Sequence, residues 1–267
     1  MVQRALVLGV ANKRSIAWSC VRALLQRNYQ VAFTYQSDRF ENTAKELIAS
    51  ETQDSDDKVL LATTCNVEKD VPLLFDEKLP ELFGDEKGFD VIVHSVAHAS
   101  AQAMKEGTLL DTTRQDFLQA HDISAYSFLE VARCAPLSQD ASLTALSYLG
   151  AVRAVPRYNV MGPAKASLEA LVRGLALELP EPQQRVNCVS AGPLSTLAAR
   201  GIDGFSRIRQ DVEERSPLRR NVTTEEVANT VCFVACDATG MSGQTVYVDA
   251  GYGVVAGPST AAAAFTE

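Results

Sequence analysis

The chain has 267 residues, of which 46% are hydrophobic and 22% are charged, and this favours one globular domain with a large core. Its formal net charge of -8 argues against a general binder of nucleic acid or of anionic membranes. The six cysteines are dispersed and do not join the three histidines in any metal-ligand spacing. This usage predicts a cytoplasmic, reducing location, no disulfide framework and no metal.

Short apolar segments predict seven strands in chain order, at 4–10, 30–35, 58–67, 89–96, 142–148, 184–190 and 244–250. The first of these segments is too short and too closely followed by Lys13 and Arg14 for a signal peptide, and no apolar run is long enough to cross a bilayer. Amphipathic segments between most strands predict helices at 15–27, 39–50, 71–83, 114–133, a stretch ending near 179, and 224–235.

This alternation predicts an α/β fold: a doubly wound, Rossmann-type parallel sheet of about seven strands with helices on both faces. A single dinucleotide-binding and catalytic domain is expected over residues 1–267. Residues 194–218 interrupt the alternation and are expected to cover the substrate, and the tail at 256–267 is expected to fray. Ligands of such a sheet bind at the carboxyl ends of its strands.

The turn after the first strand has features of a dinucleotide site. Gly9 permits a tight turn, and the small residues Ser15 and Ala17 let a helix begin close to the strand, with free N–H groups for a pyrophosphate. The regular GxGxxG pattern is absent, so an ordinary strand-to-helix turn with a small N-cap explains these residues equally well. At the end of the second strand Gln36 is neutral, and Asp38 and Arg39 oppose each other, which favours NADH over NADPH.

Two tyrosines and a lysine suggest reductase chemistry. Tyr158 and Lys165 are seven residues apart, which on a helix would place both side chains on one face. A phenol beside an ammonium group can donate a hydrogen bond to an oxygen that gains negative charge. Pro163 leaves an alternative, in which a helix begins near Gly162 and the argument from a shared face fails.

The segments GVANKRSIAW, HDISAYSF, SYLGAVRAVPRYNVMGPAKASLEA and SGQTVYVDAGY resemble the enoyl-acyl-carrier-protein reductases, a divergent branch of the short-chain dehydrogenases/reductases. Ordinary members of that larger family have Tyr four residues before Lys and Ser thirteen residues before that Tyr. Met161 and Tyr148 hold those positions here, which argues against a dehydrogenase acting on alcohols and ketones. The resemblance covers residues from about 6 to 255.

The resemblance implies NADH-dependent reduction of trans-2-enoyl thioesters on acyl carrier protein, in a homotetramer. It implies that Tyr158 faces the thioester carbonyl and that Lys165 holds the ribose, with Tyr148 either assisting catalysis or only packing. The implied cofactor-binding residues are Gly9, Ala11, Ser15, Ile16, Gln36, Asn66, Val67, Ser95, Ala97, Lys165, Leu194 and Thr196. The implied substrate-binding residues are Ala99, Tyr148, Tyr158, Met161, Phe205 and Ile208.

Two other functions remain open at this point. The same fold could reduce an enoyl-CoA or another enone, and a protein without turnover could still bind NAD. His94, His98 and His121 are expected to have structural roles.

Overall fold

The computed structural model describes residues 2–52, 59–84, 87–105, 108–196 and 204–256. Its seven strands form one parallel sheet in the order β3-β2-β1-β4-β5-β6-β7. The strands are β1 (Arg4–Leu8), β2 (Gln30–Tyr35), β3 (Leu60–Thr64), β4 (Phe89–His94), β5 (Leu137–Tyr148), β6 (Arg185–Ala191) and β7 (Thr245–Val248). The crossover from β3 back to β4 beside β1 creates the switch point at which a doubly wound sheet binds its ligand.

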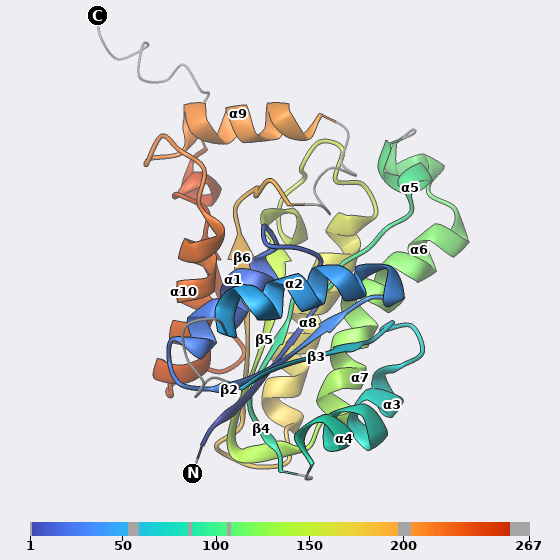
Figure 1. Cartoon of the computed structure of the whole chain (residues 1–267). Helices are drawn as coiled ribbons and strands as arrows, with labels where there is room; N and C mark the ends of the chain where they lie inside the picture. The colour runs from blue at the N-terminus through green and yellow to red at the C-terminus, as the bar shows by residue number, and fades with distance from the viewer. Residues whose placement is uncertain (1, 53–58, 85–86, 106–107, 197–203, 257–267) are drawn as a thin grey trace, which may run out of the picture.

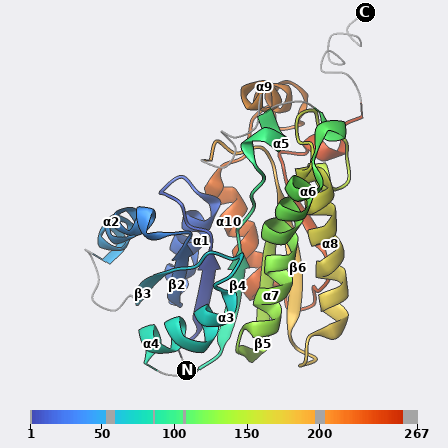
Figure 2. The same cartoon turned by 90° about the vertical axis from the view of Figure 1, so that its right-hand side faces the viewer.

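Helices cover both faces of the sheet (Figures 1 and 2). The longer helices are α1 (Ile16–Leu25), α2 (Glu41–Thr52), α6 (Arg114–His121), α7 (Ser127–Cys134), α8 (Met161–Glu178), α9 (Phe205–Arg215) and α10 (Thr224–Cys232). The short ones are α3 (Val71–Leu73), α4 (Leu79–Phe83) and α5 (Ala101–Lys105). Single turns lie at η1 (Asp38–Phe40), η2 (Leu74–Lys78), η3 (Leu109–Asp111), η4 (Asp122–Tyr126), η5 (Leu149–Ala151), η7 (Phe233–Asp237) and η8 (Tyr252–Val254).

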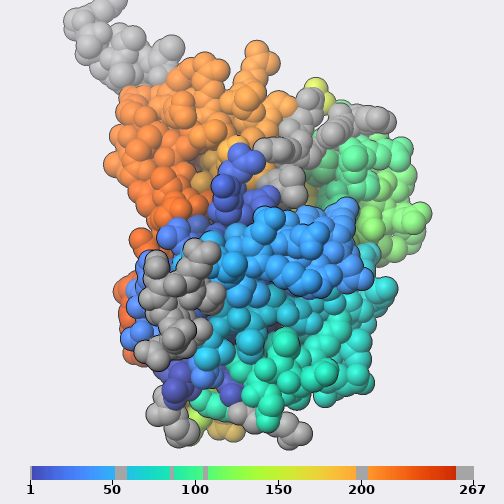
Figure 3. All heavy atoms as spheres, viewed as in Figure 1, coloured from blue at the N-terminus to red at the C-terminus, as the bar shows by residue number. Residues whose placement is uncertain are grey.

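The pattern of β1 explains why the sheet is covered on both sides. Successive side chains of a strand point to opposite faces. Ala5 and Val7 join the core beneath α1, α2 and α10, whereas Leu6 and Leu8 join the core beneath α3, α4, α7 and α8. A strand buried on both faces therefore needs a continuous apolar run, which is what the sequence has at RALVL. In the space-filling view α2 lies across the front of the molecule (Figure 3).

The predicted fold class, the seven strands and the six predicted helical stretches are confirmed. The strand β5 begins at Leu137, five residues earlier than expected, and its pairing with β4 contains a register irregularity. The sequence pattern also missed α5 and α9, since α5 is short and α9 is a strongly polar helix. Residues 197–203 of the expected cover and 257–267 of the expected tail lie outside the described part of the chain.

No helix within the described residues is long and apolar enough to cross a membrane. All six cysteines are free thiols, as the sequence predicts.

Candidate active site

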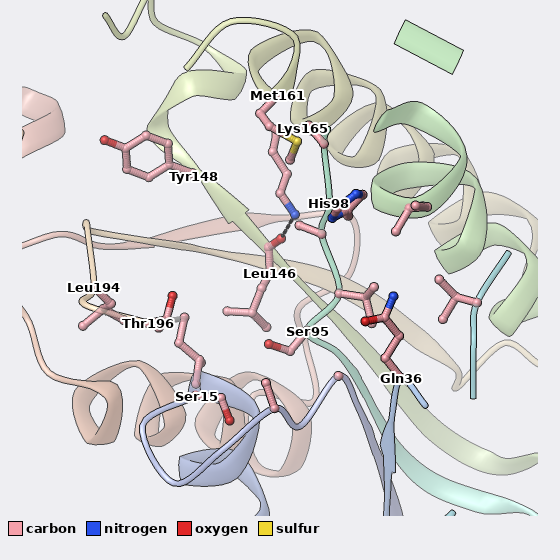
Figure 4. Close-up of a pocket in the computed structure, with 18 of the residues that line it drawn as sticks. Ser15, Gln36, Ser95, His98, Leu146, Tyr148, Met161, Lys165, Leu194 and Thr196 are labelled. Carbon is pink, nitrogen blue, oxygen red and sulfur yellow. Dashed lines mark hydrogen bonds between the residues drawn. The ribbon is translucent and has the colours of Figure 1, made fainter. Parts of the chain in front are cut away.

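A cavity of about 600 Å³ lies at the carboxyl ends of the strands, and the tips of β1, β2, β4 and β5 all reach it. Every residue that the sequence assigned to cofactor, substrate or catalysis lines this cavity. Figure 4 draws 18 of the lining residues, and the ten that it labels lie around the cavity on different sides. One cavity therefore holds both halves of the expected site.

The tip of β1 meets the tip of β4 at one end of the cavity. Gly9 has a φ of +93°, and a Cβ built there would lie 2.4 Å from the carbonyl oxygen of Ser95. Only glycine permits both this conformation and this close approach. Beside it, Ser15 caps α1: its hydroxyl accepts from the N–H of Trp18 at 3.2 Å and donates to the carbonyl of Asn12 at 2.7 Å. The N-terminus of α1 is thereby fixed beside the cavity, where helix N–H groups suit an anion.

The β2 tip carries a neutral amide beside a cation. The Arg39 guanidinium donates to Gln36 Oε1 at 3.1 Å and lies 4.6 Å from the centre of the Phe40 ring. Arg39 and Phe40 line the cavity beside Gln36, and for Phe40 no sequence motif indicates this placement.

The loops after β3 and β4 are held by local hydrogen bonds. Asn66 donates its backbone N–H to the Asp70 carboxylate at 2.9 Å, and its side-chain oxygen accepts from the N–H of Glu68 at 3.2 Å. Ser124 accepts from the N–H of His98 at 3.0 Å and donates to the carbonyl of the same residue at 3.1 Å. His98 lines the cavity, a placement that no spacing in the sequence indicates.

The remaining two histidines have structural roles, as predicted. His94 is fully buried and lies 2.8 Å from the Ser127 hydroxyl, and burial lowers the pKa of His94 to about 3. His121 stacks on Phe117 and lies 2.8 Å from its carbonyl oxygen. Among the described residues, no group of three His, Cys, Asp or Glu side chains could hold a metal ion.

Lys165 is buried at the base of the cavity. Its ammonium group donates to the carbonyl of Leu146 at 2.7 Å (Figure 4). Burial lowers the pKa of Lys165 to about 8, whereas Cys188 and Glu169 act in the opposite direction. Between Leu146 and Tyr148, the Ser147 hydroxyl donates to the buried Glu169 carboxylate at 2.6 Å, a bond that ties the end of β5 to α8.

The two tyrosines pack edge to face, with ring centres 4.8 Å apart. Burial and the neighbouring Tyr148 raise the pKa of Tyr158 well above the usual range of a phenol, so Tyr158 is a neutral donor at neutral pH. The Tyr148 hydroxyl points away from Lys165 (Figure 4).

The argument that Tyr158 and Lys165 share a helix face is wrong. The helix α8 begins at Met161, three residues after Tyr158, with Pro163 in its first turn. Proline is tolerated there because the first helical N–H groups have no partner within the helix. Tyr158 therefore reaches the cavity from the loop and Lys165 from the helix, and tertiary structure brings them to one site.

The helix α9 covers one side of the cavity. Phe205 and Ile208 in its first turns line the cavity, as the sequence assigned them. Its later turns are tied to neighbouring segments: the Tyr252 hydroxyl donates to the Asp211 carboxylate at 2.6 Å, and the Asn221 amide donates to the Glu213 carboxylate at 2.6 Å.

Comparison with known proteins agrees over nearly the whole chain. A family model described as enoyl-(acyl carrier protein) reductase matches residues 9–253. The chain is 41% identical to the NADH-dependent enoyl-acyl-carrier-protein reductase FabI of Bacillus subtilis, covering 94% of this chain and 95% of that protein. It is 40% identical to the protein of the same name from Escherichia coli K12, with 95% of each covered.

Solved structures give the same result. The enoyl-acyl-carrier-protein reductase (NADH) of Aquifex aeolicus superimposes with a TM-score of 0.87 at 36% identity, over 96% of this chain and 98% of that one. The Bacillus cereus enoyl-acyl carrier protein reductase, in complex with NADP+ and an indole naphthyridinone, has a TM-score of 0.86 at 39% identity, over 95% and 97% respectively.

Proposed function

The chain belongs to the enoyl-acyl-carrier-protein reductase family, and from that premise we propose that it uses NADH to reduce the C2=C3 double bond of trans-2-enoyl thioesters on acyl carrier protein. This is the last step of the fatty-acid elongation cycle. The observation that carries the proposal is the meeting of a neutral buried phenol, Tyr158, and a buried ammonium group, Lys165, in the cavity that begins at the Gly9 turn.

The residues present fit a dinucleotide. At Gly9 the missing side chain leaves the backbone open to a pyrophosphate, and the capped N-terminus of α1 offers N–H groups to its charge. Gln36 would lie near the adenosine ribose, Asn66 and Val67 near the adenine, and Lys165 against the nicotinamide ribose. The remaining residues of the proposed cofactor site are Ala11, Ser15, Ile16, Ser95, Ala97, Leu194 and Thr196.

Tyr158 acts on the thioester. When bound, NADH supplies the hydride that C3 of the enoyl group receives. Negative charge then develops on the thioester oxygen, and the neutral Tyr158 hydroxyl donates a hydrogen bond to that oxygen. A proton taken up at C2 neutralises this charge and completes the reduction. Lys165 orients the ribose and adds a positive charge to the floor of the cavity. Ala99, Tyr148, Met161, Phe205 and Ile208 enclose the acyl chain in this proposal.

Replacement of the two central residues tests the proposal. Tyr158→Phe removes the donor to the developing oxyanion, so we expect kcat to fall by about a hundred- to a thousandfold while the Kd for NADH stays unchanged. Lys165→Met removes a charged donor to the ribose, so we expect the Kd for NADH to rise by about tenfold or more. Both are measured from NADH absorbance and fluorescence, and wild-type turnover in both variants would refute this site.

The substrate itself separates the proposal from its rivals. We expect a higher kcat/KM with a carrier-bound enoyl thioester than with crotonyl-CoA, and a higher value with NADH than with NADPH. An enzyme for enoyl-CoA would have the higher kcat/KM with crotonyl-CoA. An inactive NAD-binding protein would bind NADH without oxidising it in the presence of either thioester.

Exposed apolar side chains support a homotetramer, which we propose as the assembly. Leu118 of α6 and Tyr126 of η4 are 60% and 42% exposed, and Leu177 of α8 is 88% exposed. The helices α6, α7 and α8 lie side by side on one face (Figure 2), so these side chains suit a symmetric contact with a second copy. The six free thiols support a cytoplasmic location, where thiols stay reduced.

A further inference from the structure

Gly150 lies between the two tyrosines of the site, in the turn η5 that follows β5. A Cβ built on this glycine would lie 2.3 Å from Cδ1 and 2.6 Å from Cε1 of Tyr158, and 3.4 Å from Cδ1 of Tyr148. Carbon atoms that are not bonded pack at about 3.5–4.0 Å. A methyl group at position 150 would therefore occupy the volume of the Tyr158 ring.

The backbone of Gly150 does not itself require glycine. The glycines with positive φ in the described residues are Gly9, Gly84, Gly204, Gly243 and Gly251. Gly150 is outside this group, so its backbone conformation is open to residues with a side chain. A side chain at position 150 is excluded by the space that the Tyr158 ring occupies.

Away from the cavity, the Tyr158 ring is enclosed by packed side chains. Tyr158 is 8% exposed and packs in a cluster with Ala103, Met104, Ala120, Val160, Met161 and Ala164. On another side lies the Tyr148 ring. The ring is therefore held between the bare backbone of Gly150 and a closed apolar cluster.

The turn that carries Gly150 is fixed as well. The carbonyl of Leu149 accepts from the N–H groups of Val152 and Arg153 at 3.1 and 3.0 Å. The first turn of α8 packs beneath it, since a Cβ on Gly162 would lie 3.1 Å from the carbonyl oxygen of Gly150. A side chain at position 150 would therefore displace the ring, by about 1 Å if ordinary carbon contacts are restored.

We propose that Gly150 is a positioning residue that sets where the Tyr158 hydroxyl meets the thioester oxygen. This inference rests on the proposed function of Tyr158. A displacement of about 1 Å in a catalytic group can cost on the order of a hundredfold in rate. The effect falls on kcat, because Lys165 contacts Leu146 and takes no part in the contact with Gly150.

Gly150→Ala tests the inference in the full-length protein. We expect kcat to fall by about a hundredfold, and by no more than in Tyr158→Phe, while the Kd for NADH stays unchanged. Gly240→Ala is the matched control, because a Cβ on this exposed residue, which lies outside α6, α7 and α8, meets nothing within 4 Å. This control should keep wild-type kcat.

A second background isolates the contact with the ring. In Tyr158→Ala the ring is absent, so adding Gly150→Ala should lower neither kcat nor Tm any further. If Gly150→Ala alone fails to fold, the double variant should fold. Three outcomes would each overturn the inference. The first is wild-type kcat in Gly150→Ala, and the second is an equal loss of kcat or Tm in both backgrounds. The third is a double variant that also fails to fold. Absence of NADH oxidation by the wild-type protein with an enoyl thioester would instead count against the proposed function, and the Tm comparison would still test the contact.

Discussion

Lys165 shows how one buried residue sets a pH limit for the whole site. Burial lowers the pKa of this amine to about 8, so its charge is present at neutral pH and is lost as the pH rises through that value. The titratable groups that act on Lys165 are Cys188 from β6 and Glu169 from α8, and Lys165 in turn acts on His94 in β4. The pKa of Cys188 is raised to about 12 and that of His94 is lowered to about 3. Neither group changes charge between pH 7 and 9.5.

The NADH affinity should therefore depend on pH through Lys165. We expect a constant Kd below about pH 7 and a Kd that rises above pH 8 by up to about tenfold per pH unit, as the ammonium group loses its proton. Fluorescence titration of NADH between pH 6 and 9.5 measures this dependence. The Lys165→Met variant should bind weakly with no such slope, and a slope that persists in this variant would point to another group.

At the level of elements, α9 lines the cavity at its N-terminal end and is hydrogen-bonded to a neighbouring turn nearer its C-terminal end. Phe205 and Ile208 near its start line the cavity, whereas the carboxylate of Asp211 accepts from the hydroxyl of Tyr252 and from the guanidinium of Arg215 at 3.2 Å. Burial and the bond to Asp211 raise the pKa of Tyr252 to about 12, so this phenol stays protonated over the working range of the enzyme. The η8 turn is thus hydrogen-bonded to the helix that lines the proposed acyl site.

Tyr252→Phe should loosen this cover without touching the cofactor site. Because the hydrogen bond is partly exposed, we expect its loss to cost about 1 kcal/mol of binding free energy. This would be measured as a rise of about fivefold in the KM for the enoyl thioester. Hydrogen exchange across 205–215 should quicken, and the Kd for NADH should not change. Identical exchange and KM in the variant would show that Tyr252 does not hold α9.

Some elements could be predicted from the sequence and others could not. Strands buried on both faces leave continuous apolar runs, so RALVL and its counterparts were visible without a structure. The polar α9 leaves no such pattern. Likewise, Gly9 and Lys165 belong to motifs, whereas the placement of His98 and the contact between Gly150 and Tyr158 depend on segments that meet only in the folded chain. Tyr158 and Lys165 line one cavity, but the shared helix face from which the seven-residue spacing grouped them does not exist.

At the level of the whole molecule, one parallel sheet places the residues of the proposed cofactor site and of the proposed acyl site along a single edge. The face formed by α6, α7 and α8 lies to the side of that edge (Figure 2). Assembly through this face would therefore leave each cavity accessible.

Leu118→Asp should weaken that assembly. A carboxylate placed in an apolar contact between subunits would be desolvated without a partner, so we expect dissociation to smaller species in sedimentation velocity at micromolar concentration. Leu118→Met keeps an apolar surface and should assemble as the wild type does. A wild-type sedimentation coefficient for Leu118→Asp would place the subunit interface elsewhere.

Because all seven strands run in one direction, β1 starts at the end of the sheet opposite α5 and α9 (Figure 1). An affinity tag or a surface linker joined ahead of Val2 would thus extend from the far side of the protein. Immobilised in this way, the enzyme would present the carboxyl ends of its strands, where the cavity lies, to the surrounding solution. This orientation suits binding assays on a sensor chip.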